Sequence, residues 1–309
     1  MAKDAPFDRH IARATEAAFA VWLNASDGVR LRAAKLGDGT KGTVFLFSGR
    51  TEYIEKYGET GAAFATAGLS TLSIDWRGQG LSDRHLSDPL IGHVEKFTDY
   101  QKDVAALVSW AEKIDAPRPW FLLGHSMGGA VALRALTEGM AIDKAAFSGP
   151  MWGISLSPPV RAFAWVTANL SERIGFGEKI IPGGQREPYP LHADPADNLL
   201  THDAEMLAWM KSQLEAEPGL GLGGPSLTWL AEALRETRKL QAIKDPKVAS
   251  LTLLGDQEAI VDVAAIEKLT SRWPEAHLHR VANCRHEVLM ESPALRQDAY
   301  RRLVEFYLS

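Results

Sequence analysis

Short apolar runs alternate with longer segments of helical periodicity along most of the chain. Apolar residues spaced at i, i+3 and i+4 predict helices at 98–114, 127–139 and 293–308, and another at 9–23 that packs on a sheet or mediates dimerisation. The runs typical of strands lie at 28–36, 42–49, 69–75, 119–125, 144–150, 247–255 and 276–281. The first alternates like a strand with one exposed face, and the others are typical of buried strands. This order predicts an α/β fold with a mostly parallel central sheet flanked by helices.

The alternation breaks between about 151 and 235. This region has helical pieces, stretches rich in Gly and Pro, and no convincing strand. An insertion between two strands predicts a helical cap over the carboxyl edge of the sheet, where such folds bind ligands. We therefore expect a core made of 1–150 and 236–309, with a cap at 151–235. The alternative is a helical subdomain with no role in binding.

Composition excludes several classes of protein. The chain has 309 residues, of which 46% are hydrophobic and 24% charged, as in an ordinary soluble protein. A net charge of −5 gives no basic footprint for nucleic acid. The single cysteine, Cys284, excludes an intramolecular disulfide and suits a reducing compartment. No run reaches the ~20 apolar residues of a membrane span or forms a signal-peptide core, so we expect a cytoplasmic protein.

The stretch FLLGHSMGG at 121–129 follows a buried strand and opens a helix. It contains the pattern G-x-S-x-G centred on Ser126, and in this setting the pattern marks a nucleophile. The tight turn exposes the Ser126 hydroxyl at a helix N-terminus, which favours negative charge. His125 fills a variable position of the pattern and is expected to be structural. The alternative is a glycine-rich turn that only packs a helix on a strand.

A serine hydroxyl needs a neighbouring base to become a good nucleophile. In this arrangement the partners follow in the order serine, acid, histidine. His286 lies in a loop between the last predicted strand and the final helix, downstream of an acid-bearing loop, and is the predicted base. His277 and His279 share one face of a strand, but no third ligand is in view, so we predict no metal site.

Three carboxylates compete for the role of the acid in the stretch LLGDQEAIVD at 253–262. Asp256 follows a glycine and can hydrogen-bond its own turn. Asp262 precedes an amphipathic helical run and is well placed as its N-cap. Glu258 has no comparable structural explanation, so we predict that it orients His286, with Asp262 and Asp256 as the alternatives.

Two backbone N–H groups are the expected donors of an oxyanion hole. One belongs to Met127, the residue after the nucleophile, and the other to Arg50, in the loop after the strand at 42–49. The side chains of Arg50 and Glu52 either pair with each other, or Arg50 faces a phosphate of the substrate.

Several stretches together carry a family resemblance: SGRTEYIEKYGE, SIDWRGQGLSDR, IGHVEKFTDYQKDV, GHSMGGA, SGPMWGI, GGPSLTWL, GDQEAIVD and RHEVLME. From about residue 40 to the C-terminus the chain closely resembles bacterial lysophospholipases of the α/β-hydrolase superfamily, relatives of the monoacylglycerol lipases. The resemblance implies an α/β-hydrolase fold with a helical cap. It also implies hydrolysis of a single acyl chain from a lysolipid or monoglyceride through an acyl-serine, without metal or organic cofactor. Ser126, Glu258 and His286 fall on the family's catalytic triad.

This sequence departs from the family in two places. Ser48-Gly49 stands where the relatives carry His-Gly or Pro-Gly, which keeps the backbone donor but changes the stiffness of the loop. The cap matches only in patches between 160 and 225.

The apolar residues of the predicted cap favour an apolar substrate. Trp152, Phe163 and Trp165 are candidates to line a channel over Ser126 or to lie against a membrane surface, and the alternative is that they form the core of the cap. The expected partner is an acyl ester or lipid, with transient contact at the inner membrane. The sequence predicts no oligomeric state. A general carboxylesterase, thioesterase or aminopeptidase-like hydrolase fits the same residues, and so, more weakly, does a non-catalytic binding protein.

Overall fold

A computed structural model describes residues 3–157, 165 and 175–309 of the chain. Nine strands form one sheet in the order β1-β2-β3-β5-β4-β6-β7-β8-β9. The strands from β5 to β9 in this order run parallel, and the first three are antiparallel to their neighbours. Their bounds are β1 Lys3–Ala5, β2 Phe19–Asn24, β3 Arg30–Gly37, β4 Thr43–Phe47, β5 Ser70–Ile74, β6 Trp120–His125, β7 Lys144–Ser148, β8 Ala249–Gly255 and β9 Ala276–Val281. The predicted, mostly parallel sheet is therefore confirmed.

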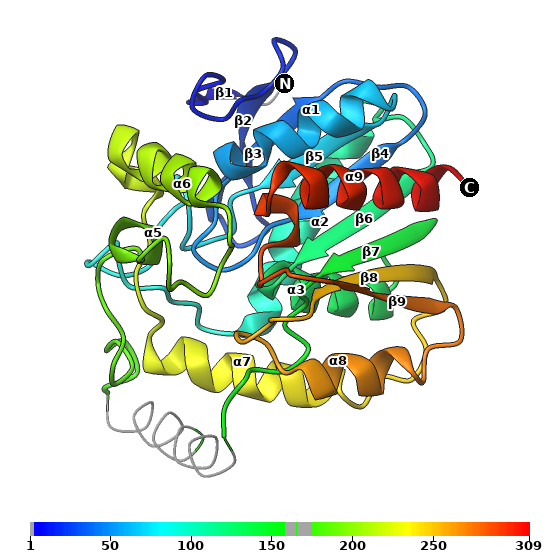
Figure 1. The fold of residues 1–309 in the computed structure, drawn as a ribbon. Helices are drawn as coiled ribbons and strands as arrows, with labels where there is room; N and C mark the ends of the chain where they lie inside the picture. The colour runs from blue at the N-terminus through cyan, green and yellow to red at the C-terminus, as the bar shows by residue number, and fades with distance from the viewer. Residues whose placement is uncertain (1–2, 158–164, 166–174) are drawn as a thin grey trace.

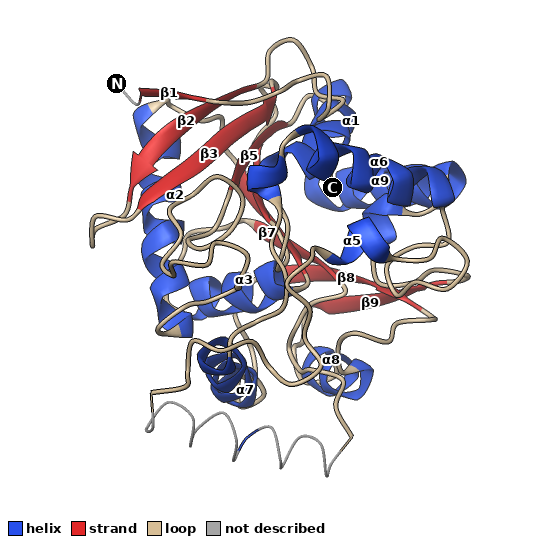
Figure 2. Cartoon of the chain, turned by 90° about the vertical axis from the view of Figure 1, so that its left-hand side faces the viewer, coloured by secondary structure: helices blue, strands red, loops and turns tan. Residues whose placement is uncertain are grey.

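Helices cover both faces of this sheet, as Figures 1 and 2 show. Helices α1 (Gly58–Thr66) and α9 (Pro293–Leu308) lie on one face, and α2 (Tyr100–Lys113), α3 (Met127–Thr137) and α8 (Val263–Thr270) on the other. The alternation of side chains along β4 explains the two cores: Val44 and Leu46 pack with the α1 and α9 side, and Phe45 and Phe47 with the α2 and α3 side. All of β4 is buried because both faces are covered.

The insertion between β7 and β8 carries the helices α5 (Tyr189–His192), α6 (Ala204–Ala216) and α7 (Leu227–Leu240). Short 3-10 turns lie at Ile54–Tyr57 (η1), Phe97–Asp99 (η2), Pro218–Leu220 (η3) and Val288–Met290 (η4). Ser226 caps α7 by accepting a hydrogen bond from the Trp229 N–H at 3.0 Å. Helix α7 packs on α3 of the core and continues past the predicted cap boundary at 235.

Two sequence expectations about the first strands are wrong. The segment 9–23 forms turns followed by β2, not a helix, because β2 pairs along its whole length with β3. The strand expected to have one exposed face is β3, and it is buried on both faces. Its charged residue Arg32 can be buried because it pairs with Glu55 and Asp75. Edge strand β9, expected to be buried, is half-exposed along most of its length.

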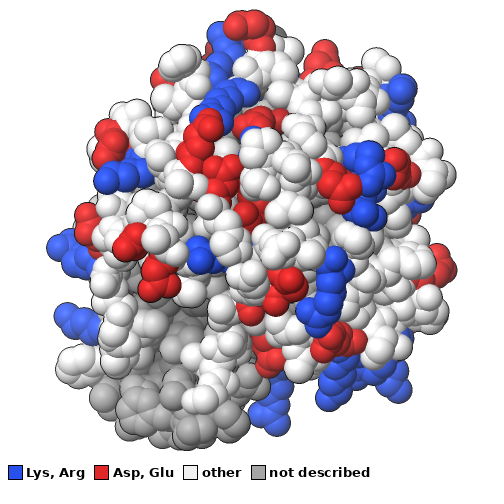
Figure 3. Space-filling model, in the orientation of Figure 1, with Lys and Arg blue, Asp and Glu red and all other residues white. Residues whose placement is uncertain are grey.

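The surface carries charges of both signs. Figure 3 shows Lys and Arg interspersed with Asp and Glu over the described part of one face, which agrees with a net charge of only −5. Within the described residues, no helix combines the length and the apolar composition that crossing a bilayer requires.

Candidate active site

Ser126 lies at the turn between β6 and α3 in a strained backbone conformation, with φ 50° and ψ −119°. Neighbouring glycines make this turn possible. A Cβ on Gly128 would lie 2.0 Å from the Phe47 carbonyl oxygen, and one on Gly129 would lie 2.5 Å from the Cβ of Pro150. The turn between β6 and α3 therefore packs tightly between the ends of β4 and β7, and this holds Ser126 at the carboxyl edge of the sheet.

Glu258 and His286 meet beside this turn. The Nδ1 atom of His286 lies 2.6 Å from Glu258 Oε2, and both side chains are almost fully buried. The other oxygen, Oε1, accepts the backbone N–H groups of Ile260 at 2.7 Å and Val261 at 3.1 Å. Burial raises the pKa of Glu258, but the hydrogen bonds from His286 and these two N–H groups outweigh it, so the pKa lies below its ordinary value. Glu258 is therefore a carboxylate that fixes the ring of His286.

His286 and Ser126 line the same cavity. In the described part of the chain the Ser126 hydroxyl makes no hydrogen bond to the imidazole, and such contacts are often loose before a substrate is bound. Gly149 lies directly beneath the pair of side chains, with φ +46°, and a Cβ there would come within 3.1 Å of both Glu258 Oε2 and His286 Nδ1.

The other two carboxylates of the β8–α8 loop have local roles. Asp262 caps α8 by accepting the Ala265 N–H at 3.1 Å. Asp256 accepts the Cys284 N–H at 3.2 Å, and backbone hydrogen bonds of this kind lower its pKa. Only Glu258, of the three, contacts His286 in the described structure.

The loop after β4 lies against the nucleophile. A Cβ on Gly49 would be 3.1 Å from the Cβ of Ser126. The N–H groups of Arg50 and Met127, predicted as oxyanion donors, have no acceptor within the described residues. Other contacts fix this loop: Trp76 Nε1 donates to the Ser48 carbonyl at 2.9 Å, and the Thr51 N–H donates to Gln79 at 2.7 Å. The loop is therefore held in place by side-chain hydrogen bonds.

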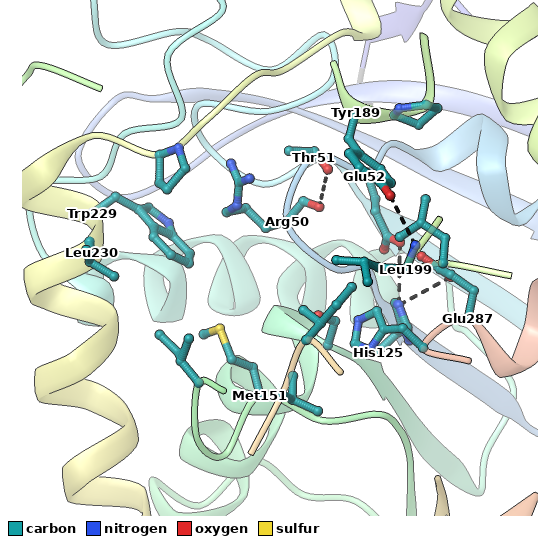
Figure 4. A pocket seen from close by; sticks show the side chains of 18 of the residues that line it. Arg50, Thr51, Glu52, His125, Met151, Tyr189, Leu199, Trp229, Leu230 and Glu287 are labelled. Carbon is teal, nitrogen blue, oxygen red and sulfur yellow. Dashed lines mark hydrogen bonds and ion pairs between the residues drawn. The ribbon is translucent and has the colours of Figure 1, made fainter. Parts of the chain in front are cut away.

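A buried charged cluster beneath the site was not predicted from the sequence. It consists of Glu52, Lys56, His125 and Glu287, and Figure 4 shows three of these side chains converging at one end of the cavity. Lys56 Nζ bonds Glu52 and lies 2.7 Å from Glu287, and His125 Nε2 lies 3.3 Å from Glu287. The His125 ring packs on that of His286 with centroids 4.9 Å apart.

Charge compensation within this cluster is nearly complete. Burial lowers the pKa of His125, but Glu287 and Glu52 raise it more, so the net shift is upward. Burial raises the pKa of Glu287, but Lys56 and His125 lower it more, and the net shift is strongly downward. The ligand atoms of Glu52, His125 and Glu287 lie within 4.8 Å of one another, yet a metal ion there would have to displace the ammonium of Lys56.

A cavity of about 560 Å³ opens over Ser126 and His286. Much of its wall is apolar and comes from the core and the cap, including Met151, Ile154, Leu199, Met210, Leu214 and Leu230. Such a cavity suits a ligand with a hydrocarbon part.

Of the three predicted cap residues, the two that the structure describes, Trp152 and Trp165, do not line this cavity. Trp152 is fully buried beneath it, where it packs against Phe147 and Trp273 and donates to the Gly129 carbonyl at 3.1 Å. The expectation for Trp152 fails because its indole belongs to the core. The ring of Trp165 faces Arg238 and is not among the residues that line the cavity, and Phe163 lies outside the described residues.

The parallel sheet, the strained serine between β6 and α3, the acid after β8 and the histidine after β9 define an α/β-hydrolase. Residues 38–293 match the family described as Serine aminopeptidase, S33, so the chain belongs to this family.

Curated relatives and solved structures are similar over most of their length. A probable lysophospholipase L2 of Haemophilus influenzae is 31% identical over 266 residues, covering 85% of this chain and 82% of that protein. A monoacylglycerol lipase of Mycolicibacterium smegmatis is 28% identical over 257 residues, covering 81% and 83%. A soluble variant of the monoglyceride lipase of Saccharomyces cerevisiae shares the fold, with a TM-score of 0.70 at 19% identity over 92% of this chain and 93% of that one.

Proposed function

We propose that the protein is a serine hydrolase that cleaves the carboxylic ester of a single-chain lipid, either a lysophospholipid or a monoacylglycerol. Ser126 Oγ attacks the ester carbonyl while His286 Nε2 takes its proton. The N–H groups of Met127 and Arg50 bind the oxyanion, and Glu258 stabilises the imidazolium. His286 then protonates the leaving glycerol oxygen, and water hydrolyses the acyl-serine by the same steps in reverse order.

The hydrogen-bonded pair of Glu258 and His286 at the cavity of Ser126 carries this proposal. The 2.6 Å hydrogen bond from His286 Nδ1 to the buried carboxylate of Glu258 fixes the orientation of the imidazole ring. This leaves Nε2 as the atom that accepts the proton of Ser126. The relatives named lysophospholipase and monoacylglycerol lipase support the lipid substrate, as does the apolar wall of the cavity.

An aminopeptidase is the second candidate, since the family description names one. Such an enzyme needs an anionic group to bind the free ammonium of its substrate. The carboxylates that line the cavity, Glu52 and Glu287, are already paired with Lys56 and approached by His125. The charge balance of the described cavity therefore favours an ester substrate over a peptide.

Entry of a lipid from a membrane surface is part of the proposal. Among the described cap residues, two large apolar side chains are exposed: Phe176 is 54% exposed, and Leu199, which also lines the cavity, is 49% exposed. Because Leu199 is both exposed and part of the cavity wall, it gives a hydrocarbon chain a short path from bilayer to site.

A fluorophosphonate probe and a substrate panel test this function. The probe should label the wild type and the control Ser271→Ala, whose serine is on the surface, but not Ser126→Ala. Rates on lysophospholipid and monoacylglycerol should exceed the rate on a two-carbon aryl ester. Labelling of Ser126→Ala would contradict the mechanism, and preference for the short ester would contradict the lipid substrate alone.

A further inference from the structure

The cavity contains a cation that has no acidic partner among the residues that the structure describes. Arg50 lines the cavity, and its side chain lies between Trp229 and Thr51 in Figure 4. It forms no ion pair with any carboxylate of the described residues, and Glu52, the acid nearest to it in sequence, pairs with Lys56. Arg50 is partly buried, and a charged group that loses much of its contact with water is normally paired, so this arrangement needs an explanation.

The guanidinium is held firmly in the wall. Its Nη1 donates to the Gly223 carbonyl at 2.8 Å, and its Cζ lies 5.5 Å from the centroid of the Trp229 ring. Gly92 allows this position, because a Cβ there would lie 3.0 Å from Nη1. Core and cap thus both fix the group.

Most of the hydrogen-bonding capacity of Arg50 is unused in the described part of the chain. A guanidinium has five N–H donors, and within the described residues the Gly223 carbonyl is their one acceptor. Burial lowers the pKa of Arg50 to about 10, so the side chain remains a cation at neutral pH. An immobilised cation with free donors at an apolar cavity is suited to a planar or tetrahedral anion.

We infer that the Arg50 guanidinium binds the phosphate of a lysophospholipid whose ester lies at Ser126. This inference rests on the proposed function and makes its substrate the phosphate-bearing lipid. The neutral monoacylglycerol leaves the same cation unpaired.

Chain lengths agree with this assignment. Six bonds separate the ester carbonyl carbon from the phosphorus of a 1-acyl lysophospholipid, which is about 7 Å when extended at roughly 1.2 Å per bond. Five bonds separate the Cα of Arg50 from its guanidinium carbon, which is about 6 Å on the same scale. The backbone N–H of Arg50 can therefore bind the oxyanion while its side chain reaches the phosphate of the same molecule.

The test compares two substrates with the same acyl chain, palmitoyl-lysophosphatidylglycerol and monopalmitoylglycerol, in mixed detergent micelles. The variants are Arg50→Gln, which removes the charge, and Arg50→Lys, which keeps the charge but cannot donate two parallel hydrogen bonds as a guanidinium does. Arg186→Gln is the matched control, because Arg186 is an exposed cap arginine paired with Asp88.

Arg50→Gln should lower kcat/KM for the lysophospholipid relative to the monoacylglycerol by about 10- to 100-fold, as expected for hydrogen bonds to a charged group. The loss should fall mainly on KM, because the phosphate is remote from the reacting carbon. Arg50→Lys should restore part of the ratio, and Arg186→Gln should leave it unchanged.

An equal loss of kcat/KM on both substrates would overturn the inference, because it would show that the Arg50 side chain only maintains the conformation of the loop. In a competition arm, glycerol 3-phosphate should inhibit the wild type more strongly than inorganic phosphate. Equal inhibition by the two would also overturn it, in favour of a site for free phosphate. Absence of hydrolysis of both lipids by the wild type would instead refute the proposed function.

Discussion

Replacement of Glu258 by glutamine tests how the site orients its base. Glutamine keeps the size of the side chain but has one acceptor oxygen and an NH₂ donor. Because the Ile260 and Val261 N–H groups demand the oxygen, the NH₂ would face His286 Nδ1. Nδ1 would then have to accept, which places the ring proton on Nε2, where it cannot receive the proton of Ser126.

The size of the effect follows from the lost charge. In the transition state an imidazolium faces the carboxylate with Nδ1 and Oε2 2.6 Å apart. Treating the charge centres as ~4 Å apart at an effective dielectric constant of ~20 gives about 4 kcal/mol. That energy corresponds to a rate loss of about 10³-fold.

The assay is kcat/KM on an aryl ester, with the melting temperature measured for each variant to show that it is folded. Asp256→Asn and Asp262→Asn are matched controls from the same loop, and both should keep the rate within about twofold, since asparagine serves turns and N-caps nearly as well as aspartate. Retention of more than a tenth of the rate by Glu258→Gln would refute the reasoning. An equal loss in Asp256→Asn would do the same.

Two further predictions concern buried residues around the site. Lys56→Met should lower the free energy of unfolding by about 3–5 kcal/mol in urea titrations, because it leaves the carboxylates of Glu52 and Glu287 buried without their cation; an unchanged midpoint would show that the cluster is not charged as described. Trp152→Phe should cost about 1–3 kcal/mol through its lost indole hydrogen bond and leave the preference for acyl-chain length unchanged. A shifted chain-length profile would return Trp152 to the cavity wall.

The sequence led to the nucleophile and to the acid through local signals. Ser126 stands in a pattern whose glycines are needed within a few residues of it, between a strand and a helix. The sequence favours Glu258 because Asp256 and Asp262 each have a role in their own turn or helix cap, and the structure shows these two in those positions. The catalytic roles of these residues stay predictions until the variants are measured.

The N-terminal segment and the cap show where local patterns fail. Residues 9–23 have helical spacing, but the part from Phe19 onward pairs with β3 as strand β2, and the residues before it form turns. Trp152 lies shortly after β7, in an apolar stretch of the kind that can line a channel. Its burial depends on Trp273, more than a hundred residues later in the chain.

The sequence by itself determined the fold class, the elbow at Ser126 and the choice among three carboxylates, because each depends on periodicity or on hydrogen bonds within one turn. Only the tertiary structure decided which charges are paired. Lys56 meets Glu287 across 231 residues of chain, and among the described residues this leaves Arg50 as the cavity-lining cation without a carboxylate partner. The physical reason is that burial makes an unpaired charge costly, and which charges are buried together depends on how distant segments pack.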